Sequence, residues 1–170
     1  MKKFIGVLLF VFLLTGCGGN ETTKTVSSGV SVDEYEERVQ KVLDEKGDKT
    51  EFKIIATEKT EDNEYGIYLS DEVAIFLDTT EEKGVNMATI GVSPSLQLSN
   101  EDDFNFAFEL LIGTADDELT LGERTKLRQE LGLYDAETFT DKTSHSKENN
   151  NITFTFRGVP SEMFVLEAKY

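Results

Sequence analysis

The sequence predicts an α+β fold: a helix, an antiparallel four-strand meander, two helices and a three-strand meander. Three observations favour this fold. Apolar residues recur at helical spacing after the capping box that Ser31 and Glu34 form. Short alternating apolar segments separated by polar turns are typical of antiparallel strands. The apolar stretch DFNFAFELLIG, beginning at Asp103, is typical of a central buried helix.

The first helix is expected to begin after Ser31 and to stop at Gly47, a residue suited to the position beyond a helix end. Its core-facing residues are Val32, Tyr35, Val39, Val42 and Leu43. Four strands should follow, at 52–57, 65–69, 73–77 and 85–92. Polar turns at 60–64 and 81–84 and a tight break at Ser70-Asp71 separate them, and Pro94 ends the fourth strand.

The second half should begin with a helix capped within 99–102 and ended by Gly113. A further capping box, Thr120 with Glu123, opens a helix that ends at Gly132. Three strands are then expected at 138–145, 152–157 and 163–169, with 146–151 as the first turn.

The two halves suggest a weak internal repeat. Ser31-x-x-Glu34 matches Thr120-x-x-Glu123, and Ile67-x-Leu69 matches Phe154-x-Phe156, at offsets of 87 to 89 residues. Two helix-plus-meander repeats would form one curved sheet with helices on one face. That layout is similar to the tandem-repeat β-lactamase inhibitor proteins, which bind a partner on a concave sheet, and the likeness is one of layout alone.

The N-terminus has the features of an export signal. Lys2 and Lys3 precede an apolar run from Phe4 to Leu14, which as a helix is about 16 Å long against about 30 Å of bilayer core. The run ends in Leu14-Thr15-Gly16-Cys17. This tetrad resembles the lipobox of bacterial lipoproteins.

The resemblance implies that the Cys17 thiol receives a diacylglyceryl group and that the chain is cut after Gly16. Two acyl chains anchor a protein stably, whereas one does not. The expected organisation is a lipoprotein signal peptide at 1–16, a lipidated cysteine with a flexible Gly/Ser/Thr-rich tether at 17–30, and one globular domain at 31–170. The protein should therefore lie on the extracytoplasmic face of the cell membrane.

Charge limits the partners of the body. Beyond residue 16 the chain carries 15 Lys and Arg against 33 Asp and Glu, a net charge of −18. That balance argues against nucleic acid, which needs clustered basic residues, and against the body lying on anionic lipid. The acidity is explained by solubility outside the cell; the alternative is that it attracts a basic protein partner.

Catalytic constellations are sparse. His145 is the single histidine and Cys17 the single cysteine, so no zinc site or nucleophile–base pair is expected. The run Asp116-Asp117-Glu118 could gather Ca²⁺ but lacks the ligand spacing of an EF-hand loop. We therefore expect no cofactor, no metal and no enzyme activity.

The leading hypothesis is a protein-binding or inhibitory module that engages an envelope or exported protein. Its candidate interaction surface is formed by Tyr65, Tyr68 and Phe76 on the first meander. One alternative is a carrier of small ligands or peptides with an apolar pocket beside the 104–112 helix. Another is a hydrolase that uses two carboxylates.

Overall fold

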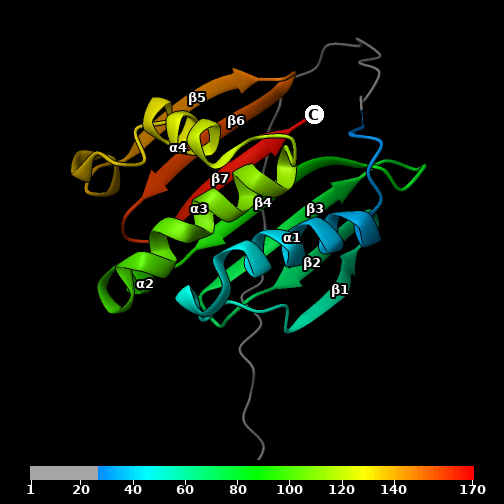
Figure 1. The fold of residues 1–170 in the computed structure, drawn as a ribbon, viewed down its shortest axis with the longest axis horizontal. Helices are drawn as coiled ribbons and strands as arrows, with labels where there is room; N and C mark the ends of the chain where they lie inside the picture. The colour runs from blue at the N-terminus through cyan, green and yellow to red at the C-terminus, as the bar shows by residue number, and fades with distance from the viewer. Residues whose placement is uncertain (1–26) are drawn as a thin grey trace, which may run out of the picture.

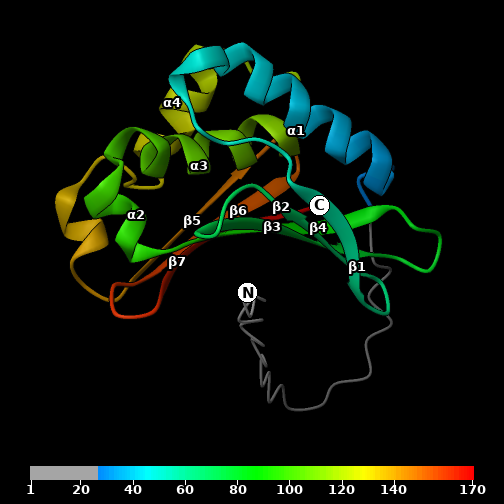
Figure 2. The same ribbon diagram turned by 90° about the horizontal axis from the view of Figure 1, so that it is seen from below.

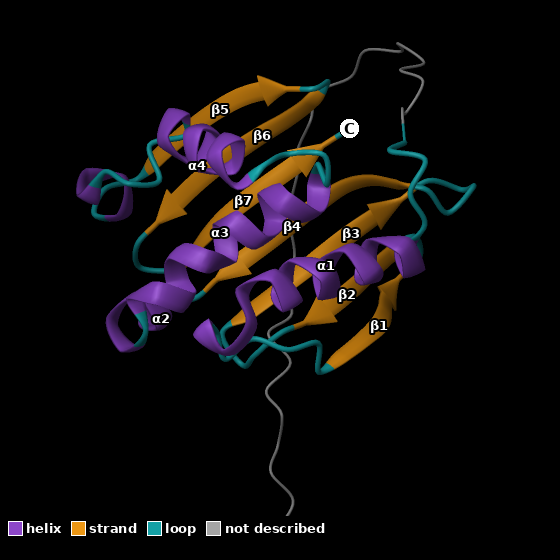
Figure 3. Cartoon of the chain, in the orientation of Figure 1, coloured by secondary structure: helices purple, strands orange, loops and turns teal. Residues whose placement is uncertain are grey.

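A computed structural model describes residues 27–170 (Figures 1 and 3). The helices are α1 (Val32–Lys46), α2 (Pro94–Ser99), α3 (Glu101–Ala115) and α4 (Leu121–Glu130), with the 3-10 turns η1 (Gly47–Lys49) and η2 (Ala136–Phe139). The strands are β1 (Ala56–Glu61), β2 (Glu64–Tyr68), β3 (Val73–Thr79), β4 (Val85–Val92), β5 (Thr143–Asn149), β6 (Ile152–Val159) and β7 (Met163–Lys169). The leader, Cys17 and most of the expected tether lie outside the described residues.

All seven strands form one antiparallel sheet in the order β1-β2-β3-β4-β7-β6-β5. The helices lie together on one face of this sheet and form the helix layer (Figure 1). Seen from below, the sheet is arched, with the helix layer on its outer side (Figure 2). The predicted α+β class and order of elements are confirmed.

The two meanders meet at the β4–β7 pair, but the expected offset between them is wrong. An offset of 87 to 89 residues would match β3 with β7, which run in the same direction on opposite sides of β4 and under the same helix layer. That is a mirror relation, which a repeated chain of L-amino acids cannot adopt. Strand order and direction instead fit a two-fold rotation about the β4–β7 pair, which exchanges β4 with β7, β3 with β6 and β2 with β5.

Both predicted capping boxes are present. The Ser31 hydroxyl accepts the Glu34 amide at 3.2 Å, and the Glu34 carboxylate accepts the Ser31 amide at 2.9 Å. Thr120 and Glu123 repeat this arrangement at the start of α4. These hydrogen bonds hold the pKa of each glutamate below its ordinary value. Each box satisfies two amides that the helix itself leaves without partners.

The core between the sheet and the helix layer is built on phenylalanine. Phe104 of α3 packs edge-on against Phe108 at 5.3 Å, Phe139 at 5.1 Å and Phe164 at 5.4 Å between ring centroids. Phe156 of β6 joins the same cluster through Phe108 at 5.6 Å. The cluster therefore joins α3 and η2 to the second meander.

Two predicted strands are displaced in the structure. The strand expected at 52–57 begins only at Ala56, although the Ile55 amide already donates to the Tyr68 carbonyl at 2.9 Å. Just before it, Thr50 Oγ1 and the Glu51 amide donate to the Asp103 carboxylate of α3. The strand expected at 138–145 begins at Thr143, after η2, and continues to Asn149. The cause is a turn of only two residues at Asn150-Asn151, both with positive φ, which lets pairing run to its edge.

Three further boundaries differ from the prediction. Gly113 does not end α3, which continues to Ala115 and is followed by Asp116 at the C-cap. Pro94 does end β4, but it also starts the short helix α2, which the sequence prediction lacked and which Ser93 caps. Ser28, expected in the tether, already bonds to the sheet: its amide and its hydroxyl each donate to the Val85 carbonyl at 2.8 Å. The tether therefore joins the body beside the β3–β4 turn.

Candidate open sheet face

No other helix or strand of residues 27–170 lies over the sheet face away from the helix layer, here called the open face (Figure 2). Alternate residues of β3, β6 and β7 are buried against the helices, and those between them point to the open face. Strand register arranges the open-face residues of β2, β3, β4, β7 and β6, in that order, in three rows across the sheet. The first row is Tyr68, Ala74, Gly91, Val165 and Arg157, and the second is Gly66, Phe76, Thr89, Glu167 and Thr155. The third row is Glu64, Asp78, Met87, Lys169 and Thr153.

Two of the three predicted interface residues come together on this face. Tyr68 and Phe76 meet edge-on with 6.5 Å between ring centroids, and Phe76 remains 37% exposed. Gly66 permits the contact, because a Cβ there would lie 3.1 Å from the Tyr68 ring. Tyr65 lies on the opposite face, paired with Leu77 and packed against the core. Tyr65 and Tyr68 are three positions apart on β2, so the two cannot share a face of one strand.

An acidic pair borders the aromatic pair. Glu64 and Asp78 are directly opposite each other on β2 and β3, and Asp78 is two residues beyond Phe76 on the same face. Burial raises the pKa of the Asp78 carboxyl above its ordinary value, and the charges of Glu64 and Glu167 raise it further. Among residues 27–170 neither Glu64 nor Asp78 has an ion-pair partner within 4.0 Å.

The second meander presents a different surface. Arg157 of β6 reaches Glu167 of β7 at 3.4 Å, so these two charges compensate each other. Thr153 and Thr155 occupy the neighbouring open-face positions of β6. The uncompensated negative charge and the exposed aromatic rings therefore lie together on the β2–β4 half of the face.

The two edges of the sheet are poorly suited to pairing with another strand. β1 is ATEKTE, with a register irregularity between Lys59 and Glu61, and β5 is TSHSKEN, exposed along most of its length. Charged and irregular edge strands oppose edge-to-edge association. His145 lies exposed on β5. The broad contact surface of the sheet is thus its open face.

The helix expected to line a ligand pocket is packed into the core. Phe104 and Phe108 are at most 1% exposed, and the rest of the cluster fills the space beside them. Two shallow, open hollows lie instead along the outside of α1, lined by charged and polar residues with Asp117 at one edge. Neither contains a residue of α3, so the described body gives the carrier hypothesis no support.

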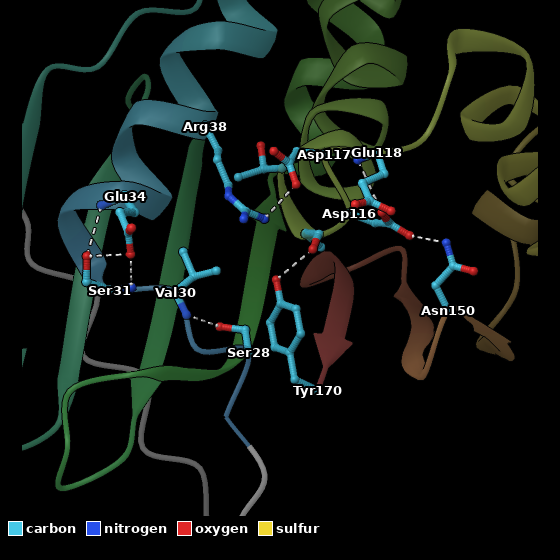
Figure 4. Close-up of polar contacts among 12 residues, drawn as sticks. Ser28, Val30, Ser31, Glu34, Arg38, Asp116, Asp117, Glu118, Asn150 and Tyr170 are labelled. Atoms are coloured by element: carbon cyan, nitrogen blue, oxygen red, sulfur yellow. Dashed lines mark hydrogen bonds and ion pairs between the residues drawn. The ribbon is translucent and has the colours of Figure 1, made fainter.

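The acidic run after α3 serves the structure. The Asp116 carboxylate accepts Asn150 Nδ2 at 2.8 Å and the Glu118 amide at 3.3 Å, while Asp117 pairs with Arg38 of α1 at 3.1 Å. Figure 4 shows Arg38 and Asn150 approaching the run from different elements. Nowhere within residues 27–170 do three or more His, Cys, Asp or Glu side chains converge as a metal site would require.

The acidic pair does not form a hydrolase site as it stands. Glycosidases hold their substrate between two carboxyl groups that flank the scissile bond. Glu64 and Asp78 stand side by side on an open face, and neither lines either hollow along α1.

The sequence contained a signal for this pair that the prediction overlooked. Ser70-Asp71 is a tight break in the sequence, and antiparallel partners lie at equal distances on either side of such a break. Glu64 and Asp78 are each seven residues from Asp71, so their pairing follows from the turn.

Comparison of the chain with protein-family models, curated proteins and solved structures found no significant match. No helix in residues 27–170 has the length and apolar character needed to cross a bilayer. The function is therefore argued from the open face itself.

Proposed function

We propose that this protein is a lipid-anchored extracytoplasmic module that binds another protein on its open face and performs no chemistry. The observation that carries the proposal is the Tyr68–Phe76 pair, with Phe76 exposed and Tyr68 half-buried, on a sheet face that no described element covers. Aromatic residues dominate the energetic centres of protein interfaces, because they bury a large area with little loss of side-chain freedom.

The apolar surface extends beyond the two rings. Met163 lies over Gly91, since a Cβ at that glycine would be 2.7 Å from its sulfur, and Val165 pairs with Gly91 in the next strand. Methionine side chains adapt to different partner shapes. A partner on this face would therefore meet a rigid aromatic pair beside a more adaptable patch.

The point where the tether joins the body agrees with this arrangement. Ser28 binds β4 at the end of the sheet where β3 turns into β4, beside the acidic residues Glu81 and Glu82. The net charge of −18 beyond residue 16 makes anionic lipid repel the body, which favours a position away from the membrane surface. The open face then remains accessible along the length of its strands.

The anchor is tested by replacing Cys17 with serine. We expect the variant to leave the membrane fraction and to lose labelling by a fatty-acid probe, because serine cannot receive the diacylglyceryl group through a thioether. Membrane retention together with continued labelling would contradict the lipoprotein assignment. Thermal unfolding of the body serves as the control and should not change.

The binding face is tested with two matched variants of the full-length, affinity-tagged protein. Phe76→Ser removes an apolar side chain from the open face, and Leu98→Ser removes one that is 91% exposed on α2 in the helix layer. Both proteins are extracted in mild detergent and used to capture envelope proteins. We expect Phe76→Ser to reduce capture of a specific partner by at least about tenfold and Leu98→Ser to leave it unchanged. Capture that survives Phe76→Ser would contradict the proposal.

A further inference from the structure

The open face carries two side chains of the same charge directly opposite each other, an arrangement that β-sheets usually avoid. Like charges directly opposite each other on neighbouring strands destabilise a sheet, and Glu64 and Asp78 are such a pair. Within the described residues, Glu64 accepts a hydrogen bond from Thr60 Oγ1 at 2.6 Å, whereas no donor reaches the Asp78 carboxylate. Residues that lower stability without an evident structural gain are expected at functional sites.

We infer that the open face binds a cationic segment of its protein partner, with a lysine or arginine side chain lying across Phe76 and its charged end between Glu64 and Asp78. This inference rests on the proposed function and specifies the chemistry of the partner. The long stem of such a side chain packs on apolar surface while its end stays among polar groups. An aromatic ring and a carboxylate pair on adjacent positions match both parts of that side chain.

Other occupants fit this surface less well. A second copy of the chain would bring the same carboxylates face to face, and the excess of acidic residues would repel it further. A single metal ion needs several ligands around one point, whereas register places Glu64 and Asp78 on adjacent strands and Glu167 two strands beyond Asp78. Anionic lipid and nucleic acid are repelled by the same charges.

The groups around Asp78 do not neutralise its charge, which leaves a cation of the partner to do so. Across β2 it faces Glu64, with Glu61 directly beyond Glu64 on β1 and Glu58 in the neighbouring row, opposite Gly66. Across β4 it faces uncharged Met87, and beyond it lie Lys169 and Glu167 on β7. Lys169 forms no ion pair with a described carboxylate on this face, and Glu167 is already bound by Arg157. A cation delivered from outside would therefore relieve the acidic pair.

The binding test uses the full-length protein in mild detergent and a fluorescent hexalysine peptide as probe. The first variant combines Glu64→Gln with Asp78→Asn. Its matched control combines Glu37→Gln with Asp48→Asn, two exposed residues on α1 and the turn after it, so that both proteins lose the same charge. We expect the open-face variant to bind hexalysine about tenfold more weakly and the control to bind within about twofold of the wild type. Equal weakening in both, or no binding to the wild type, would overturn the inference.

This test separates the inference from the proposed function. The open-face charge variant could bind hexalysine as the wild type does, while Phe76→Ser still abolishes partner capture. In that case the inference of a cationic partner segment is wrong, and the proposed binding face is retained. If capture survives Phe76→Ser, the proposed function itself fails.

The melting temperature of the protein provides a second measurement. A carboxyl retained at position 78 for a structural reason would not give the result expected here. The raised pKa of Asp78 means that the folded protein is most favoured when this carboxyl is protonated, and that this contribution is lost as pH rises through its folded-state pKa. We expect Asp78→Asn to raise the melting temperature at neutral pH by about 1 to 3 °C, and the difference to disappear at acidic pH. A lower melting temperature at neutral pH would contradict the view that Asp78 is kept at a cost to stability.

Discussion

Replacing Phe104 with alanine is expected to lower the free energy of unfolding by about 3 to 5 kcal/mol, the usual cost of removing a large buried aromatic side chain. Phe104 is 1% exposed and contacts Phe108, Phe139 and Phe164 at ring-centroid distances of 5.1 to 5.4 Å. These neighbours come from three elements and cannot close together over the gap. Because a domain of this size is stable by only about 5 to 15 kcal/mol, the variant should unfold at a much lower urea concentration.

Phe104→Leu is the matched control, since leucine fills much of the same volume. It is expected to cost about 1 to 1.5 kcal/mol, and the slope of the urea transition should stay the same in both variants. A cost below about 1 kcal/mol for Phe104→Ala would mean that the phenylalanine cluster is not packed as one unit.

Replacing Asp103 with alanine should have the next largest effect, about 2 to 4 kcal/mol, because hydrogen bonds to a buried charged group are strong and their loss leaves donors unpaired. Asp103 is 2% exposed. Its carboxylate accepts Thr50 Oγ1 at 2.6 Å, the Glu51 amide at 3.2 Å and Asn100 Nδ2 at 3.0 Å. It therefore ties the segment before β1 to the start of α3.

Asp102→Ala is the control for this substitution, because Asp102 is the exposed neighbour of Asp103 in the same helical turn. Its loss should cost no more than about 0.5 kcal/mol. Urea unfolding measures both variants, and hydrogen exchange should report faster opening of the 50–55 segment in Asp103→Ala alone. Equal costs for the two substitutions would contradict the role given to Asp103.

Local signals in the sequence were sufficient for most of the architecture. The capping boxes at Ser31 and Thr120 depend on residues three apart, and both helices begin where these boxes predict. Alternation likewise located 163–169, which is β7 in the structure. These features require only neighbouring residues, so pattern and propensity decide them.

Features that depend on distant partners were less accessible. Phe139 looked like a strand residue, but it enters the core from a 3-10 turn because a space in the phenylalanine cluster accommodates it. Phe52 packs on Phe106 at 6.1 Å before β1 begins, since Asp103 holds the preceding backbone. No local pattern contains the position of α3 relative to either segment.

The candidate site was predictable in part for the same reason. Tyr68 and Phe76 belong to adjacent strands whose turn was recognised, and alternation places both on the face opposite Ile67 and Ile75. Tyr65 was grouped with them by residue type, although its position along the strand puts it in the core layer. Which face remained open could not be read from the strands, because it depends on where the helices pack.

The central claim is that another protein contacts the open face, and cross-linking in the intact membrane tests it most directly. A photoreactive amino acid is placed at position 76 or at position 98 of the full-length protein, and the cells are irradiated. We expect a discrete adduct with another protein from position 76, which the Glu64→Gln/Asp78→Asn variant weakens, and none from position 98. An adduct from position 98 alone would contradict the account.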